Sequence, residues 1–190
     1  MTSTRWIEIV GALFGIAAVY FNTKQNVLGW IIGLANLGLY TVFYFRGQLY
    51  GYMGLQLFFA AISLYGWYQW VRGGARQTGV TVTRTPARLW PPLVVLSGAA
   101  AVGLAWYLDT QTTDGNPYVD AVVTAASMAA QWMMARKYLE SWVVWIAVNV
   151  VSVPLFLVRG EYPTALQYTV FLGLAVSGLR QWHRSLGGSS

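Results

Sequence analysis

Long apolar runs, separated by short polar segments, account for most of this chain. Seven of them approach the roughly 20 residues that an α-helix needs to cross the hydrocarbon core of a bilayer. They cover residues 6–22, 27–45, 49–71, 90–108, 117–135, 139–158 and 162–182. The pattern therefore predicts an all-α polytopic membrane protein with seven transmembrane helices.

Composition favours the same class of protein. Of the 190 residues, 56% are apolar and only 9% are charged, which is too few charges to cover a water-soluble globule of this size. The chain has no cysteine and a single histidine, so we expect neither a disulfide nor a metal site. The net charge of +6 is divided among the segments between apolar runs, which argues against nucleic acid as a partner. The first run lacks a small-residue cleavage site and is expected to remain as a membrane helix.

Short motifs recur about 113 residues apart, which indicates an internal duplication. The matched pairs are Asn36 with Asn149, Arg46-Gly47 with Arg159-Gly160, and Gly66–Trp70 with Gly178–Trp182. The first two pairs differ by 113 (149 − 36) and the third by 112 (178 − 66), so we expect a one-residue slip between the copies.

The duplication divides the chain into two triple-helix repeats. Residues 1–71 form the first, residues 72–108 a cytoplasmic loop and linker helix, residues 109–182 the second, and residues 183–190 a cytoplasmic tail. Because three spans is an odd number, one linker helix lets the second copy enter the membrane in the same direction as the first. The resulting parallel 3+1+3 arrangement is typical of transporters that enclose a site near mid-membrane, so transport is the leading hypothesis.

The basic residues predict the orientation. Cytoplasmic loops carry an excess of Lys and Arg, and with seven spans nine such residues fall on the side of the C-terminus against three on the other. The nine are Lys24, Arg72, Arg76, Arg84, Arg88, Arg136, Lys137, Arg180 and Arg184; the three are Arg5, Arg46 and Arg159. We therefore expect a cytoplasmic C-terminus and an external N-terminus.

Small and aromatic residues suggest how the spans pack. Gly11 and Gly15, Gly29 and Gly33, and the small residues of 97–103 in the fourth span have the spacing of close helix contacts. Most of the ten tryptophans lie near span ends, where lipid headgroups favour indole rings. Trp6, Trp67, Trp70, Trp90, Trp106 and Trp182 are assigned to this interfacial belt.

Five carboxamide side chains fall inside the spans: Asn36, Gln56, Gln131, Asn149 and Gln167. Each taken alone is accounted for by a hydrogen bond between helices, but five together favour a polar cavity or substrate site. Trp142, Trp145 and Asn149 follow one another at helical spacings of three and four, so they share one helix face. An amide beside indole faces suits a flat, cationic ring.

Glu8 and Asp120 occupy equivalent positions near the outer ends of the first and fifth spans (120 − 8 = 112). A carboxylate there can cap backbone amides, pair with a basic residue or attract a cationic substrate. His183 lies beyond the last span and is expected to be solvated.

The chain lacks a phosphate-binding GxxxxGK[ST] loop, a serine elbow and paired catalytic carboxylates. We therefore expect neither an enzyme nor a cofactor.

These residues resemble the PnuC family of bacterial vitamin transporters over roughly residues 6–182. The resemblance rests on Gly66–Trp70, on Ala130-Gln131-Trp132 followed by Arg136-Lys137, and on Glu140–Trp145 with Asn149. It implies a 3+1+3 arrangement similar to the SWEET sugar transporters, an inner-membrane location and a homotrimer. It also implies facilitated diffusion of nicotinamide riboside, which a cytoplasmic kinase then traps by phosphorylation without necessarily contacting the transporter.

By the same resemblance, the vitamin contacts fall on Trp142, Trp145 and Asn149 of the sixth span. Further contacts are expected from Asn36, Gln56, Gln131 and Tyr168. Thiamine and riboflavin remain open as alternative substrates, because relatives in the family are thought to carry them. A membrane interaction scaffold, in which the amides serve only helix packing, is the alternative from another class.

Overall fold

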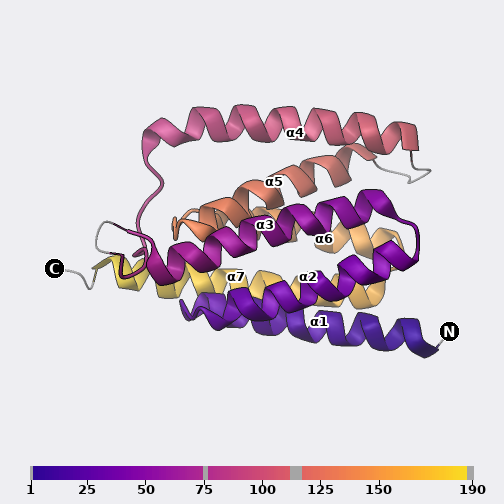
Figure 1. Cartoon of the computed structure of the whole chain (residues 1–190). Coiled ribbons are helices and arrows are strands. Elements are labelled where there is room, and N and C mark those ends of the chain that lie inside the picture. Colours follow the sequence, from indigo (N-terminus) through magenta and orange to yellow (C-terminus); the bar gives the residue numbers. More distant parts are fainter. Residues whose placement is uncertain (1, 75–76, 112–116, 188–190) are drawn as a thin grey trace.

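The computed structural model describes residues 2–74, 77–111 and 117–187, without the side chains of residues 2–8, 111 and 187. Arg76 and the side chains of Arg5, Trp6 and Glu8 therefore lie outside the described part. Seven α-helices form within it, each matching one of the seven predicted runs to within a few residues at most ends (Figure 1). They are α1 (Thr2–Thr23), α2 (Leu28–Arg46), α3 (Tyr50–Arg72), α4 (Trp90–Gln111), α5 (Pro117–Ala135), α6 (Ser141–Val158) and α7 (Tyr162–Gly187), with a 3-10 turn at Ala87–Leu89.

The helix axes lie alongside one another. The last residues of α1, α3, α5 and α7 all lie at the same side of the bundle as the C-terminus (Figure 1). The N-terminus lies at the opposite end. By length and composition, Leu28–Arg46, Ala87–Thr110 and Ser141–Val158 are each long and apolar enough to cross a membrane. The prediction of a polytopic helical membrane protein is consistent with this bundle.

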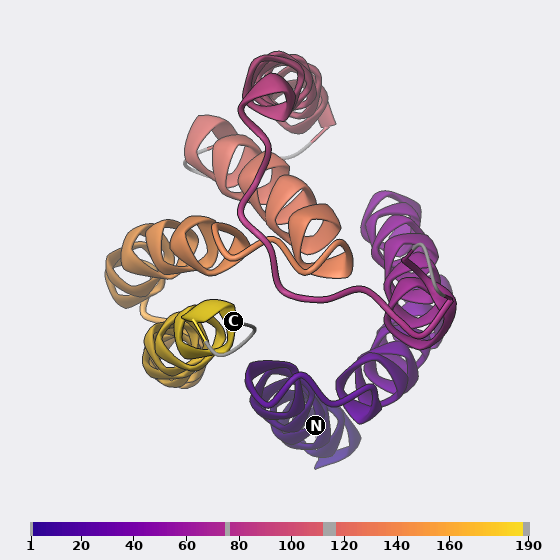
Figure 2. The ribbon, with the colours of Figure 1, turned by 90° about the vertical axis from the view of Figure 1, so that its left-hand side faces the viewer.

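Two sets of helices pack in matching ways. In the first helix set (α1, α2 and α3) and the second (α5, α6 and α7), neighbouring helices in the sequence contact each other. The two sets meet where α1 contacts α7 and α3 contacts α5. Helix α4 packs against α5 at the outside of the bundle (Figure 2).

The turns within the two sets repeat at an offset of 112. Gln25 and Lys137 have φ angles of 56° and 53°, and Gln48 and Gly160 have 56° and 75°. Their hydrogen bonds repeat as well. The amide after Gln25 donates to the Phe21 carbonyl at 2.9 Å, and the amide after Lys137 donates to the Met133 carbonyl at 2.9 Å. The expected one-residue slip is therefore wrong, because both turns keep the same length. Asn36 is equivalent to Val148, one residue or about 100° of helix rotation away from Asn149.

Four buried tryptophans form the core at the end where α3 and α7 finish. This tryptophan quartet consists of Trp30, Trp70, Trp142 and Trp182, each with at most 4% of its surface exposed. Trp30 and Trp70 meet edge to face at 5.4 Å, Trp142 and Trp182 repeat that geometry at 5.4 Å, and Trp70 meets Trp182 at 5.8 Å. Assigning Trp70 and Trp182 to the lipid interface was therefore wrong.

Glycines make this packing possible at two equivalent positions. A Cβ atom at Gly66 would lie 2.6 Å from the Trp30 ring, and one at Gly178 would lie 2.5 Å from the Trp142 ring. In α4, by contrast, a Cβ at Gly98 or Gly103 would meet nothing within 4 Å. The expected close contact along the fourth span is absent at these two glycines because α4 lies at the periphery.

Helix α7 extends to Gly187, so residues 183–187 of the segment assigned to the tail continue the helix. The last turns are held by the bundle: Trp182 is fully buried, and the Gln25 side chain donates a 3.2 Å hydrogen bond to the Ser185 hydroxyl. His183 is exposed, in line with expectation.

Candidate functional site

A cavity of ≈ 390 Å³ lies between the two helix sets. Its described lining comes from α1, α2, α3, α5, α6 and α7, and none from α4. It extends from the level of Gly15 and Tyr168 to a floor made by Trp30 and Trp142. Because residues of both sets line it, a ligand there would contact both halves of the bundle.

The structure brings six of the seven predicted contact residues to this cavity. They are Asn36, Gln131, Trp142, Trp145, Asn149 and Tyr168. Gln56 is not among the lining residues. Its neighbour Leu55 faces the cavity, as does Phe59 one turn later, and Gln56 lies about 100° further round α3.

Several buried polar atoms of the lining have no hydrogen-bond partner. Among the described residues these are the Oδ1 atoms of Asn22, Asn36 and Asn149, and the indole Nε1 atoms of Trp30 and Trp142. The Asn149 amide nitrogen is used, since it donates to the Trp145 carbonyl at 2.7 Å. Leaving a buried polar group unpaired costs about 1–3 kcal/mol. A ligand rich in hydroxyl and amide groups would recover that cost.

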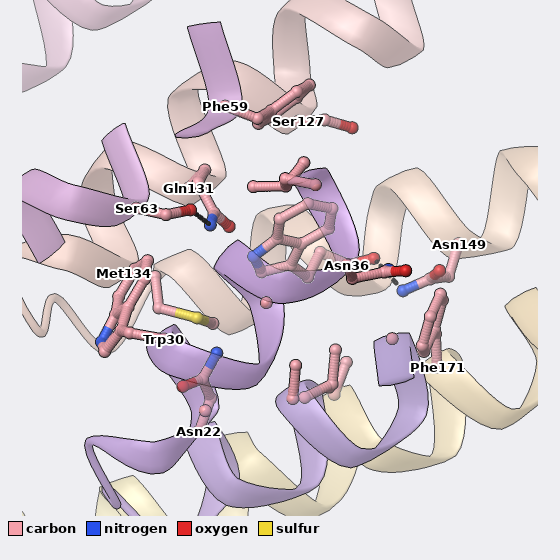
Figure 3. Close-up of a pocket in the computed structure, with 18 of the residues that line it drawn as sticks. Asn22, Trp30, Asn36, Phe59, Ser63, Ser127, Gln131, Met134, Asn149 and Phe171 are labelled. Carbon is pink, nitrogen blue, oxygen red and sulfur yellow. Dashed lines mark hydrogen bonds between the residues drawn. The ribbon is translucent and has the colours of Figure 1, made fainter. Parts of the chain in front are cut away.

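The amides lie on different sides of the cavity. Figure 3 shows Gln131 beside Ser63 on one side, and Asn36 and Asn149 together on the other. Gln131 donates to the Ser63 hydroxyl at 3.3 Å, which joins α5 to α3 across the boundary between the sets. Asn36 is placed near α1 and α7 because Gly15 has no side chain, so that the Asn36 amide and the Phe171 ring both approach it.

Aromatic rings supply most of the remaining wall. Trp145 is half-buried, whereas Trp142 is only 1% exposed, with its ring against Gly178 and Trp182. Trp142 therefore belongs to the quartet as well as to the cavity floor. Tyr168 packs between Phe156 and Phe171, with ring centroids 5.0 and 5.9 Å away.

The described lining carries no charged side chain. Asp120 is instead paired with Arg159 through bonds of 2.6 and 3.2 Å, which ties the start of α5 to the end of α6. Of the three roles considered for Asp120, the structure selects pairing with a basic residue. The described residues also contain no group of three or more His, Cys, Asp or Glu that could hold a metal ion.

Sequence reasoning missed seven polar or aromatic lining residues: Asn22, Trp30, Phe59, Ser63, Thr124, Ser127 and Phe171. A signal existed for Trp30, because it is 112 residues before Trp142, the offset already found for Trp70 and Trp182. The small hydroxyls of Ser63 and Ser127 carry no comparable pattern in the sequence.

Comparison with known proteins adds three findings. Residues 5–184 match the family model described as nicotinamide mononucleotide transporter. The chain is 28% identical to the nicotinamide riboside transporter PnuC of Escherichia coli, over 95% of this chain and 86% of that protein. It is 29% identical to the riboflavin/roseoflavin transporter RibM of Streptomyces davaonensis, over 93% and 84%.

A solved structure has the same fold. The crystal structure of the vitamin B3 transporter PnuC superposes with a TM-score of 0.75 and 26% sequence identity. The match covers 97% of this chain and 83% of the other.

Proposed function

Because the chain belongs to the PnuC family, the nicotinamide mononucleotide transporters, we propose that it imports nicotinamide riboside by facilitated diffusion. The observation that carries this proposal is the uncharged cavity between the helix sets, in which buried amide oxygens and indole N–H groups have no partner. A vitamin with hydroxyl and carboxamide groups would complete those hydrogen bonds.

The proposed contacts divide the cavity into two parts. Trp145 stacks on the pyridinium ring, with Trp142 closing the floor beneath it, and a cation over an indole face is worth about 0.5–2 kcal/mol. Asn36, Asn149 and Gln131 hydrogen-bond the carboxamide and ribose, and Tyr168 covers the ligand from the opposite end. Gln56 has no proposed contact, since it does not line the cavity.

The arrangement proposed for transport is a parallel 3+1+3 repeat, similar to the SWEET proteins, with α4 as the linker. The matching turns and the common direction of α1, α3, α5 and α7 support it. The distribution of Lys and Arg supports insertion in the bacterial inner membrane with the C-terminus in the cytoplasm. Trapping of the vitamin by a cytoplasmic kinase would give the import its direction, and assembly as a homotrimer follows the family resemblance.

Riboflavin is the second candidate substrate, favoured by the similarity to RibM. A neutral isoalloxazine ring needs no carboxylate, and the described lining offers none. Thiamine shares a cationic ring with nicotinamide riboside and is the third candidate.

Uptake into proteoliposomes tests the proposal. Purified protein is reconstituted, and entry of labelled nicotinamide riboside, riboflavin and thiamine is compared with entry into protein-free liposomes. We expect nicotinamide riboside to enter fastest and to raise the melting temperature most. Faster entry of another vitamin would reassign the substrate. Neither transport nor ligand-induced stabilisation with any of the three would favour the interaction scaffold.

Two pairs of variants locate the site. Trp145→Ala is expected to weaken vitamin binding roughly tenfold or more, equivalent to about 1.4 kcal/mol; its control is Trp67→Ala, at an exposed indole on α3. Asn149→Leu is expected to do the same against the control Gln56→Leu. Equal affinities within both pairs would contradict the proposed contacts.

A further inference from the structure

The floor of the cavity is also a place where side chains of the two helix sets meet. Trp30 and Trp142 line the cavity, and Trp70 and Trp182 pack behind them as the second layer of the quartet. The contact between Trp70 and Trp182 joins a side chain of α3 in one set to a side chain of α7 in the other. These two rings lie beyond the cavity floor, at the end of the bundle where α3 and α7 finish.

Two reciprocal hydrogen bonds hold the rings in place. The Trp70 Nε1 atom donates to the Met134 carbonyl at 3.2 Å, and the Trp182 Nε1 atom donates to the Asn22 carbonyl, also at 3.2 Å. Trp70 and Trp182 differ by 112, as do Asn22 and Met134. Each bond runs from one helix set to the other, so the pair fastens the sets together twice by the same contact.

The segment of residues 77–86, between α3 and α4, packs near this contact. It crosses the end of the bundle toward α4 (Figure 2). Val80 and Val82 pack against the buried core cluster that contains the quartet, and the Val80 amide donates to the Gln69 carbonyl at 3.1 Å. The carboxylate of Glu140, just before α6, accepts hydrogen bonds from the Thr85 amide and hydroxyl at 2.7 and 2.8 Å.

We propose that the Trp70–Trp182 contact, with its two reciprocal hydrogen bonds, is the gate of the cavity at the C-terminal end of the bundle, and that residues 80–85 keep it shut. The gate opens when both indoles leave the carbonyls of the opposite set, which lets the sets separate at this end. The inference rests on the proposed transport through the cavity.

The bonds have the strength that a gate requires. A single neutral hydrogen bond contributes little net stability, so two of them can break during each transport cycle. The bidentate ion pair between Asp120 and Arg159, by contrast, joins helices within the second set and would not restrain separation of the two sets. A strong ion pair thus stabilises the second helix set, whereas two weaker hydrogen bonds join the two sets.

The gate and the ligand site share two residues. Asn22 and Met134 supply the two carbonyls, and the side chains of both line the cavity. The Asn22 side-chain oxygen is among the unpartnered acceptors. A ligand that binds this oxygen therefore contacts the residue that anchors Trp182.

Accessibility of the cavity floor tests the gate without any ligand. The chain has no cysteine, so a single reporter can be placed by Ala175→Cys, at a buried floor position on α7. Its reaction with a membrane-impermeant thiol reagent is measured in inside-out and right-side-out vesicles. Trp70→Phe and Trp182→Phe keep an aromatic ring and remove the N–H donor. Trp67→Phe and Trp106→Phe are the controls, at indoles that are 42% and 71% exposed.

We expect each gate variant to speed labelling from the C-terminal side about fivefold, and the double variant to speed it further. Labelling from the opposite side should stay unchanged. Rates equal to those of the controls would overturn the gate, and equal acceleration from both sides would show that the indoles only stabilise the bundle. Because the assay uses no vitamin, it can succeed even if the proposed substrate is wrong.

A second variant covers the case in which the tryptophan variants do not fold. Glu140→Ala leaves the quartet intact and removes the acceptor for Thr85. It should also speed labelling from the C-terminal side alone. Unchanged labelling in Glu140→Ala would contradict the part assigned to residues 80–85.

Discussion

Alanine at Gly66 or Gly178 should destabilise the bundle, although alanine usually stabilises a helix. The added Cβ would lie 2.6 Å from the Trp30 ring in the first case and 2.5 Å from the Trp142 ring in the second, where ordinary contact begins at 3.4 Å. Both rings are 1% exposed and packed against Trp70 and Trp182. They therefore have to move by most of an ångström, which would disturb their edge-to-face contacts with Trp70 and Trp182.

The magnitude follows from two opposing terms. Forcing extra volume into a packed core costs about 1–3 kcal/mol. Replacing a helical glycine by alanine gains about 0.5–1 kcal/mol in chain entropy. Gly54 on α3 and Gly173 on α7 are matched controls on the same helices, because a Cβ there would meet nothing within 4 Å. The difference between each variant and its control removes the entropy term and leaves the packing cost.

The assay is a thermal melt of purified protein in detergent, followed by tryptophan fluorescence. For a chain of this length, 1 kcal/mol corresponds to roughly 2–4 °C. Gly66→Ala should melt below Gly54→Ala, and Gly178→Ala below Gly173→Ala. Because the quartet links both sites through Trp70 and Trp182, the double variant should deviate from the sum of the single ones. Variants that melt as high as their controls would refute the close packing.

Three further changes probe charged groups. Burial lowers the pKa of Lys137, so between that lowered value and 10.5 the unfolded chain binds more protons than the folded one, and stability should rise with pH there. Lys137→Gln should remove this rise in thermal melts across alkaline pH, and an unchanged pH dependence would contradict the burial. Asp120→Asn should cost about 1–3 kcal/mol in thermal melts through loss of its ion pair, whereas unaltered melting would show that the pair contributes nothing. Glu140→Ala should increase tryptic cleavage at the exposed Arg84 several-fold, with Glu161→Ala as control, and equal cleavage would argue against tethering of this segment.

Runs of apolar residues were sufficient to predict the seven helices, three of which are long and apolar enough to cross a membrane by length and composition. The same property limited what could be said about packing. In a membrane, lipid-facing and protein-facing surfaces are both apolar, so position near a span end could not distinguish the buried Trp70 and Trp182 from the exposed Trp67 and Trp106. Only the offset of 112 between the repeats indicated that Trp70 and Trp182 are equivalent to each other, and matching Asn36 with Asn149 at an offset of 113 obscured this relation.

Part of the predicted site was recovered because a polar side chain inside an apolar helix is costly unless it faces a cavity or a partner. Asn36, Gln131 and Asn149 reach the cavity for that reason. Gln56 met the same criterion but lies beside the lining, because the weak amphipathic pattern of α3 does not reveal which face points inward. Asn22 was missed because it falls in the last turn of α1, where a polar residue needs no special explanation.

The peripheral position of α4 has a consequence for how freely its sequence can change. Val94, Val95, Leu96 and Val102 each expose more than 60% of their surface, and a Cβ at Gly98 or Gly103 would meet nothing within 4 Å. Solubility in lipid, and not the shape of a neighbour, is then the main constraint on these positions. Exchanges among apolar residues should be tolerated there almost without regard to size, whereas the same exchanges beside Trp30 or Trp142 should not.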